Sequence, residues 1–340
     1  MHEIDFLPVG KKQGDKCGDA IAFRFRSTDD EPWVQVVVDA GFKADGEALV
    51  EHVNKYYEPG RLDLAILTHP DKDHINGMGE VLRGLSVERL WLHRIGAHGG
   101  ESLEAADAVE DLISIAQERG TDVYEVFAGT QAFDGALTIL GPDEDYYDQL
   151  VAAQVERLSL AEAARKAVVA AGRSILDRIA GALGEETPFP EKEVTPRNNS
   201  SMITLLTLDE RRLLLTGDAG VPAIERAWDF AEAQGLAGEL RFVQVPHHGS
   251  RRNASSAFLN RLIGLPGQAQ ASRTAYVSVS PGCTHEHPSG RVINAYERRG
   301  CEVHATAGET KCHRHGTPPR PNWSSATPLG PMVEEEETDD

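Results

Sequence analysis

Short apolar runs alternate with amphipathic stretches over the first 140 residues of the chain. Residues 62–68 are almost continuously apolar, as expected of a strand that is buried on both faces. Amphipathic spacing predicts helices at residues 74–83 and 102–119. The remaining apolar runs predict strands at residues 20–25, 33–39, 87–93, 121–127 and 137–140.

The pattern changes after residue 143. Residues 143–184 are rich in Ala, Leu, Glu and Arg with helical spacing, and residues 185–196, with Pro188 and Pro190 among them, predict an exposed loop. We therefore predict a helical insertion at about 143–197 between two halves of a sheet-containing core. The second half is predicted to contain strands at 201–208, 211–216, 240–245, 274–279 and 301–305 and helices at 221–234, 255–262 and 289–299.

The composition is that of a globular protein. Of 340 residues, 40% are hydrophobic and 26% are charged, which is enough to build one large domain or two ordinary ones. No apolar stretch approaches the length of a membrane span, and the first residues lack the basic start and apolar run of a signal peptide. The four cysteines are widely scattered, which predicts no disulfide framework. We therefore expect a soluble, cytoplasmic protein.

The net charge of −20 limits the kinds of molecule that the protein can bind. A negative field of this size repels free nucleic acid and anionic membrane surfaces, so we expect no membrane partner and no processive grip on long DNA. An anionic substrate held by a metal ion is still compatible with it. Residues 316–340 are rich in Pro and Ser and end in acids, a composition that predicts a disordered tail.

Four side chains that can bind metal follow the predicted strand at 62–68. His69, Asp71, Asp73 and His74 fall within six residues, at a strand end of the kind where α/β folds place their chemistry. Side chains two apart in an extended segment point the same way, so three of them can converge. The alternative is a polar turn in which Asp73 caps the next helix. Two His and two Asp at this density favour a metal site.

Two further predicted strands end in ligand-type residues. Asp218 follows an apolar strand and is suited to a carboxylate that bridges two cations. His247 and His248 follow the strand at 240–245. Each of these alone could be an ordinary turn or cap. Three such groups at three strand ends indicate a binuclear metal centre.

These motifs resemble those of metallo-β-lactamase-fold hydrolases, and most closely the hydrolase domain of the competence DNA-uptake channel. The shared motifs are HPDKDH (69–74), GD (217–218), VPHHGS (245–250) and HP (287–288), with weaker matches at GDA (18–20), DAG (39–41), GP (141–142) and NNSS (198–201). The resemblance covers residues 5 to about 310, apart from the insertion. It implies an α/β fold, an αββα sandwich of two mixed sheets with outer helices, in one domain over residues 1–315.

The resemblance also implies a set of metal ligands. It assigns His69 and Asp71 to a first ion, Asp73, His74 and His247 to a second, and Asp218 to a bridge between them. Asp71 stands where the superfamily motif has a second His, and an oxygen donor tilts the site from zinc toward manganese or iron. We expect two divalent ions, zinc or manganese. The superfamily usually supplies one more His to the first ion, and only His93 and His98 lie between His74 and His247.

The expected chemistry is hydrolysis by a metal-activated hydroxide. In it, Asp73 orients the hydroxide or takes its proton, and His287 donates to the leaving oxygen or binds a phosphate oxygen. Substrate binding is assigned to His248, Ser250, Arg251 and Arg252. For His248 the alternative is a metal ligand, and for the other three it is a solvated loop.

The predicted function is therefore metal-dependent hydrolysis of a phosphodiester, by a nuclease or a nucleotide phosphodiesterase. One alternative is hydrolysis of a non-phosphate bond, such as a lactone, thioester or amide, by the same centre. Another is an effector subunit of a bacterial defence or signalling complex, in which the helical insertion and the acidic tail bind a protein partner. The Arg251–Arg252 pair favours phosphate, and the substrate class follows from the resemblance.

Overall fold

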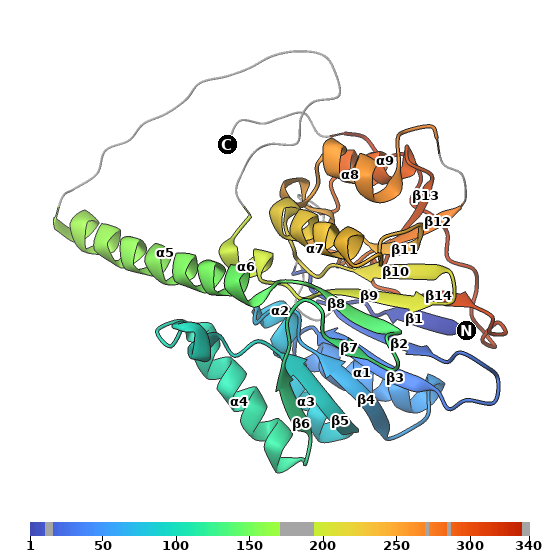
Figure 1. Cartoon of the computed structure of the whole chain (residues 1–340), viewed down its shortest axis with the longest axis horizontal. Coiled ribbons are helices and arrows are strands. Elements are labelled where there is room, and N and C mark those ends of the chain that lie inside the picture. The colour runs from blue at the N-terminus through green and yellow to red at the C-terminus, as the bar shows by residue number, and fades with distance from the viewer. Residues whose placement is uncertain (11–15, 171–193, 269–271, 284–286, 335–340) are drawn as a thin grey trace.

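The computed structural model describes residues 1–10, 16–170, 194–268, 272–283 and 287–334. Two seven-stranded sheets pack face to face, and helices cover the outer side of each sheet (Figure 1). The predicted αββα sandwich is thereby confirmed.

The first sheet is antiparallel at one edge and parallel from its fourth strand onward. Its strand order is β14-β1-β2-β3-β4-β5-β6. Strands β14, β1, β2 and β3 pair antiparallel, and β3 to β6 pair parallel. The strands are β1 (His2–Phe6), β2 (Ala20–Phe25), β3 (Val34–Ala40), β4 (Arg61–Ile66), β5 (Ser86–Leu92), β6 (Asp122–Glu125) and β14 (Lys311–His315).

The second sheet repeats this plan. Its strand order is β13-β12-β11-β10-β9-β8-β7, with antiparallel pairing from β7 to β10 and parallel pairing from β10 to β13. The strands are β7 (Gln131–Ala132), β8 (Leu137–Gly141), β9 (Ile203–Leu208), β10 (Arg211–Leu215), β11 (Leu240–Gln244), β12 (Arg273–Val277) and β13 (Cys301–Ala305). Strands β1, β7 and β14 are additions to the elements that the sequence predicts.

The helices divide between the two outer faces and the insertion. Against the first sheet lie α1 (Lys43–Tyr56), α3 (Met78–Gly84) and α4 (Glu104–Glu118), and against the second lie α7 (Val221–Ala233), α8 (Ser256–Ile263) and α9 (Gly290–Glu297). Helix α1 is a further addition to the predicted elements. Short turns of helix are α2 (Lys72–Ile75), α6 (Pro196–Asn199), η1 (Ile95–His98), η2 (His247–Gly249) and η3 (Arg251–Asn253).

Alternation along each strand builds three apolar layers. In β3, Val36 and Val38 lie between the two sheets, whereas Val37 packs against the outer helices. In β10, Leu213 lies between the sheets and Leu214 packs on the other side. Successive side chains of a strand point to opposite faces, so a strand that is covered on both faces must be apolar throughout. This explains why strands such as β8 and β9 are almost continuous apolar runs.

The predicted helical insertion begins as one long helix. Helix α5 (Glu144–Ala170) packs its first turns against the core through Tyr147, Val151 and Val155, and it then extends away from the body (Figure 1). Leu160 is 62% exposed on this extension. The part of the predicted insertion at 171–193 lies outside the described residues. Among the described residues, no helix combines the length and hydrophobicity needed to cross a bilayer.

A disulfide bond corrects one expectation from the sequence. Cys17 and Cys283 are 266 positions apart in the chain, but their Cα atoms lie 6.4 Å apart and the two residues are bonded. Separation along the chain is therefore a poor guide here, because the fold brings the two loops together at one edge of the sandwich. Disulfides persist mainly in oxidising compartments. The bond is not typical of a cytoplasmic protein and counts against the predicted location.

The described part of the segment after β14 contacts the first sheet. Within residues 316–334, the Arg320 guanidinium lies 2.6 Å from the Glu3 carboxylate and 2.8 Å from that of Asp5. Both carboxylates are buried on the outer face of β1. A buried charge needs a partner, and Arg320 supplies it. The ion pairs hold this part of the predicted tail against the first sheet, and residues 335–340 lie outside the described part of the chain.

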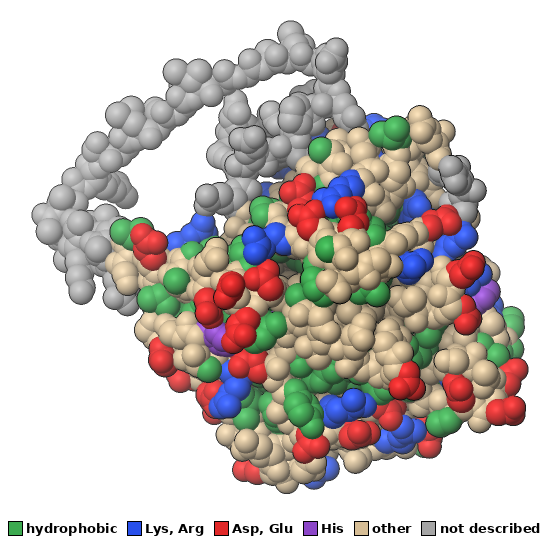
Figure 2. Space-filling model, in the orientation of Figure 1, with side chains coloured by type: hydrophobic (Ala, Val, Ile, Leu, Met, Phe, Trp, Pro, Cys, Tyr) green, Lys and Arg blue, Asp and Glu red, His purple; other side chains and the backbone are tan. Residues whose placement is uncertain are grey.

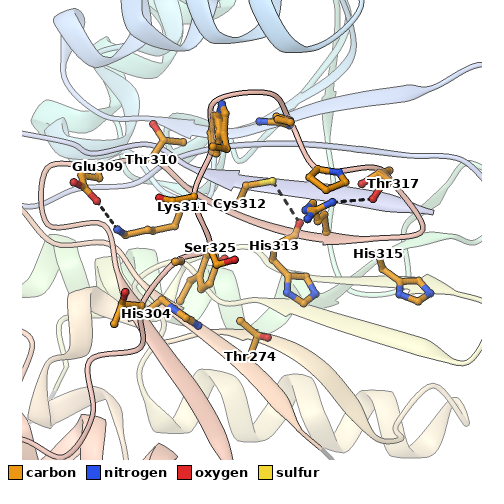
Figure 3. A pocket seen from close by; sticks show the side chains of 18 of the residues that line it. Thr274, His304, Glu309, Thr310, Lys311, Cys312, His313, His315, Thr317 and Ser325 are labelled. Atoms are coloured by element: carbon orange, nitrogen blue, oxygen red, sulfur yellow. Dashed lines mark hydrogen bonds and ion pairs between the residues drawn. The ribbon is translucent and has the colours of Figure 1, made fainter.

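A groove of about 1110 Å³ runs between this segment and the second sheet. Figure 3 shows His313 and His315 projecting from β14 toward Thr274 and His304 of the second sheet. None of the residues that line the groove belongs to the metal-ligand motifs of the sequence. The groove is thus separate from the site described below.

The Arg320 ion pairs predict a measurable loss of stability on substitution. Removing one partner of a buried ion pair costs about 3–5 kcal/mol, so we expect Arg320→Ala to lower the free energy of unfolding by about 3 kcal/mol. Urea denaturation of the full chain measures this. Arg83→Ala, which breaks an exposed pair with Glu80 on α3, is the control, and its cost should be below about 1 kcal/mol. Equal, small losses in both variants would show that the segment does not dock.

Candidate metal centre

One edge of the sandwich collects the ends of strands from both sheets. Asp39 ends β3, His69 follows β4, Asp218 follows β10 and His248 follows β11. Asp19 immediately precedes β2, which runs antiparallel to β3 and therefore starts at the same edge. All five residues are buried. Residues from distant parts of the chain thus meet where α/β folds place their chemistry.

Asp39 sets the orientation of His74. Its two carboxylate oxygens accept hydrogen bonds from the Thr68 backbone N–H at 2.8 Å, from the Thr68 hydroxyl at 2.6 Å and from His74 Nδ1 at 2.7 Å. Because Nδ1 of His74 donates to Asp39, Nε2 is the nitrogen that offers its lone pair to a metal when the ring is neutral. That nitrogen is buried and has no hydrogen-bond partner. The arrangement is that of a metal-binding His held by a carboxylate.

His69 and His248 show the same pattern. His69 Nδ1 lies 3.1 Å from the Thr68 hydroxyl oxygen and 3.3 Å from that of Ser201. His248 Nδ1 donates to the Ser278 carbonyl at 3.0 Å. In both residues Nε2 is buried without a partner. Three imidazoles are thus oriented with their free nitrogens inside the protein.

Two carboxylates complete the interior of the site. Asp218 Oδ2 lies 3.6 Å from His74 Nε2 and 3.9 Å from His69 Nε2, and its Oδ1 is buried without a hydrogen bond. Asp19 Oδ2 accepts from Gln244 Nε2 at 2.8 Å, and its Oδ1 is also unpartnered. Buried polar atoms normally have a hydrogen-bond partner or a ligand. We therefore expect one shared ligand to contact these oxygens and the three imidazole nitrogens.

The donor set fits metal ions. Ligand atoms come within 4.8 Å of one another in four overlapping groups: His69, His74 and Asp218; Asp73, His74 and His248; Asp19, Asp218 and His248; and Asp19, Asp39 and His74. Imidazole and carboxylate are the ligands of first-row divalent metals. The overlap of the groups at His74, Asp218 and His248 is consistent with a binuclear site.

Electrostatics in the chain without metal agree with this. Burial alone would lower the pKa of His248, but the carboxylates of Asp218, Asp73 and Asp19 raise it to about 9. The pKa of His74 is raised well above its usual value in spite of burial, chiefly by Asp218 and Asp39. Burial opposes ionisation of Asp218, yet the neighbouring imidazoles hold its pKa well below the usual range. The metal-free site is therefore a cluster of imidazolium and carboxylate groups.

Two of the predicted ligands lie at the edge of the site. Asp71 Oδ2 is 3.5 Å from His69 Nε2, but its Oδ1 accepts from Arg197 at 2.7 Å. His247 Nε2 is 3.6 Å from Asp218 Oδ2, and its ring is held by Asn253 at 3.0 Å. Neither belongs to the converging groups. Of the adjacent histidines, the structure places His248 inside the cluster, although the sequence analysis assigned it to substrate binding.

The predicted catalytic and substrate-binding residues lie beside the cluster. The ring of His287 is 5.8 Å from that of His247 and 6.4 Å from that of His248, between centroids. Burial and these two neighbours lower its pKa to about 4. Ser250 is buried and caps η3 by accepting from the Arg252 N–H at 3.3 Å. Arg251 is partly exposed and Arg252 is exposed on the same turn.

Asp19, Asp39 and Gln244 belong to the centre, although the sequence did not predict them there. The first two lie in the weak GDA and DAG matches, which carried no role there. Gln244, the last residue of β11, gave no signal. His93, one of the two histidines between the motifs, lies elsewhere: its Nε2 bonds the Val126 carbonyl at 2.9 Å.

The chain is similar in sequence to one known protein family. A family model described as the metallo-beta-lactamase superfamily matches residues 29–264. The match spans β3 to α8 and so includes most of the strand ends that form the cluster. Among curated proteins, no match was found.

Solved structures with related folds are distant in sequence. A candidate metallo-beta-lactamase from Thermotoga maritima is 11% identical, with 70% of this chain and 94% of the other covered and a TM-score of 0.37. A mutant metallo-beta-lactamase from Cronobacter sakazakii gives 13% identity, 68% and 73% coverage and a TM-score of 0.33. Unliganded yeast PDE1 is 10% identical, with 91% of this chain and 98% of the other covered and a TM-score of 0.43. Similarities of this size say nothing about the substrate of this chain.

The position of the two adjacent histidines predicts different effects on metal binding. Loss of a group that only supports a ligand costs about 10–100-fold in affinity, and loss of a ligand costs more. We expect His248→Ala to lose more bound metal than His247→Ala after the same dialysis. Elemental analysis of both variants measures this, with circular dichroism to check the fold. A greater loss in His247→Ala would place the inner ligand at that position instead.

Metal binding should also release protons. The raised pKa values mean that His74 and His248 are protonated at pH 7 in the metal-free chain, and a metal binds only the neutral ring. We expect release of about two protons per chain at pH 7 and a fall in metal affinity as pH decreases. Calorimetric titration in two buffers of different ionisation enthalpy measures it. Absence of proton release would contradict the assignment of these two rings as ligands.

The same shifts set the pH dependence of the metal-free fold. A raised pKa means that the imidazolium–carboxylate pairs stabilise the fold fully below the ordinary His value, and that this contribution is lost as pH rises through about 9. We expect the melting temperature of the metal-free chain to fall over that range. Loaded with metal, the chain should show a smaller fall, because the rings are already neutral.

Proposed function

The chain belongs to the metallo-beta-lactamase superfamily, and on that premise we propose that its metal centre hydrolyses a phosphodiester in a small nucleotide-like substrate. A metal-dependent hydrolase is the activity that the His and Asp cluster supports. The phosphodiester is the finer part of the proposal. It is supported by the polar groups that surround the centre.

The observation that carries the proposal is the environment of His287. This ring faces His247 and His248, and the nearby Arg252 charge helps to lower its pKa to about 4, after burial and the two imidazoles. A neutral imidazole N–H and a guanidinium therefore lie beside the metal cluster. Both are donors that suit phosphate oxygens. A lactone or thioester substrate carries no anionic oxygen at its ester group, and one forms only in the tetrahedral intermediate.

Each residue has a defined task in this proposal. Asp73 is partly exposed, and its pKa is lowered despite burial because His248 and His74 stabilise the carboxylate, so it is ionised at neutral pH and can orient water and accept its proton. His287 is neutral at pH 7, so its ring N–H donates a hydrogen bond to the leaving oxygen and transfers no proton. Divalent ions bound by the cluster supply Lewis acidity and lower the pKa of water.

The surface charge favours a short substrate over long nucleic acid. Figure 2 shows acidic side chains spread over the visible face, with basic ones scattered between them rather than gathered into a stripe. Proteins that track DNA use a continuous basic path. With a net charge of −20, the chain attracts a phosphate only close to its metal ions and arginines. We therefore propose a nucleotide or a short oligonucleotide.

The donor set favours zinc or manganese. Three imidazoles suit zinc, and the carboxylates of Asp19, Asp73 and Asp218 add hard oxygen donors that suit manganese. We propose two ions of one of these metals per chain.

A protein partner on the helical insertion is a second proposal. Helix α5 leaves the body after Val155, and Leu158 and Leu160 on this extension are 36% and 62% exposed. A helix with exposed leucines is a place where a partner helix can pack. Replacing both leucines with Glu should leave turnover unchanged and abolish any complex that forms. Loss of turnover would instead assign the extension to the active site.

The first experiment is metal analysis together with a turnover assay. We expect about two ions per chain after repletion with zinc or manganese, and metal-dependent hydrolysis of bis(p-nitrophenyl) phosphate. A chelator should abolish the hydrolysis, and returning the metal should restore it. Two bound ions with turnover of lactone or thioester substrates alone would overturn the phosphodiester proposal and leave the metal centre in place.

The Asp73 role predicts a loss of rate without loss of fold. Removing a general base typically costs about 10²–10⁴-fold, so we expect Asp73→Asn to lower kcat by about 100-fold or more. Asp111→Asn, an exposed residue on α4, is the matched control and should retain full activity. Full activity in Asp73→Asn would remove Asp73 from the mechanism.

A further inference from the structure

Arg197 lies on a short segment that follows the insertion and is tied to the metal centre. Thr195 caps helix α6 through its side chain, and the Ser200 hydroxyl donates to the Arg197 carbonyl at 2.6 Å. Pro196 occupies the first position of the helix, where its missing N–H costs nothing. These local bonds fix the backbone from which the Arg197 side chain projects.

The neighbours of Arg197 bond to the cluster and to residues that adjoin it. Asn198 Nδ2 lies 3.2 Å from His247 Nδ1. Asn199 Oδ1 accepts from the Gly220 N–H at 3.0 Å, just after Asp218. The Ser201 hydroxyl lies 3.3 Å from His69 Nδ1 and accepts from the Asp218 N–H at 3.2 Å. The segment is thus part of the wall of the centre, and its arginine is held at the rim.

The Arg197 guanidinium has more N–H donors than its hydrogen bonds to the described residues use. Arg197 Nη1 donates to Asp71 Oδ1 at 2.7 Å, and Nε makes a long contact of 3.5 Å with Gln154 Oε1. An arginine has five N–H donors in a planar fork. Within the described residues, the hydrogen bonds found for its side chain use two of them. The side chain is 36% exposed, so the remaining donors are accessible to a ligand.

The two carboxylate oxygens of Asp71 have different neighbours. Its Oδ2 points toward His69 Nε2 at 3.5 Å, while Oδ1 is engaged by Arg197. Only the Asp71 carboxylate therefore separates a ligand bound near His69 from the Arg197 guanidinium. The carboxylates of this cluster repel an anion, and Arg197 is a fixed positive charge in contact with the Asp71 carboxylate at the edge of the cluster.

We propose that Arg197 binds a non-bridging phosphoryl oxygen of the substrate and makes the site specific for anionic esters. The inference rests on the proposed function and deepens it, because it names the charge that the substrate must carry beside the cleaved bond. Arginine suits this role better than lysine, since its fork can bond a carboxylate and a phosphate oxygen at the same time. An exposed ion pair alone contributes little to stability, so the pairing with Asp71 has its main effect on position.

The test uses Arg197→Met, which keeps the length and removes the charge, and Arg197→Lys, which keeps the charge and loses the fork. Inorganic phosphate is the first probe, titrated calorimetrically into the zinc-loaded full chain. We expect phosphate binding to weaken by about 10–100-fold in Arg197→Met and by less in Arg197→Lys, with zinc content unchanged. Arg261→Met is the control, because it removes an arginine paired with Asp229 and Glu232 on the surface.

A pair of substrates separates charge from position. Bis(p-nitrophenyl) phosphate is an anion, whereas the triester diethyl p-nitrophenyl phosphate is neutral and has the same leaving group. We expect Arg197→Met to raise KM for the diester by about 10-fold or more and to change turnover of the triester by less than about twofold. Equal losses on both substrates would overturn the inference.

The outcomes also separate this inference from the proposed function. Unchanged phosphate affinity in Arg197→Met, or a loss that follows loss of zinc, would assign Arg197 a purely structural role and overturn it. If the wild-type chain binds phosphate through Arg197 but hydrolyses no phosphodiester, the proposed function fails and the anion site stands.

Discussion

The geometry of the metal centre depends on one buried carboxylate, Asp39. It accepts two hydrogen bonds from Thr68 and one from His74, and Thr68 in turn contacts His69. One charge therefore fixes the orientation of both histidines that the HPDKDH motif contributes. Each ring gives its Nδ1 to this network and keeps Nε2 for a ligand. The rest of the site, from the second sheet, is built around the positions that these two nitrogens define.

Much of the fold and part of the centre follow from the sequence. The buried strand runs and the density of His and Asp at 69–74 predict where the site lies, because that signal is local. The sequence does not show which of His247 and His248 faces the cluster. Both residues have positive φ, of 46° and 56°, in a turn that L residues rarely adopt, and this turn decides which ring faces inward. Asp19 reaches the site through antiparallel pairing of β2 with β3, which a single motif cannot show.

The centre is held by both halves of the molecule. The first sheet supplies Asp39, His69 and His74, and the second supplies Asp218 and His248. The disulfide adds a covalent tie at the same edge, since Cys17 lies two residues before Asp19 and Cys283 precedes the segment that leads to His287. The relative position of the two sheets is thus set by the apolar layer between them and fixed again next to the chemistry.

The pairing of β1 with β14 has a consequence for how the molecule assembles. His2 pairs with His315 and Phe6 with Lys311, so the first strand meets its outer neighbour only through a loop of about three hundred residues. Contacts of such long range slow folding, and during synthesis β1 exposes an unpaired edge until the last strand has left the ribosome. The edge is also short, which limits the surface available for pairing with another chain. Completion of the first sheet by β14 is therefore a late event, whereas β1 to β6 of the same sheet pair between consecutive segments of the chain.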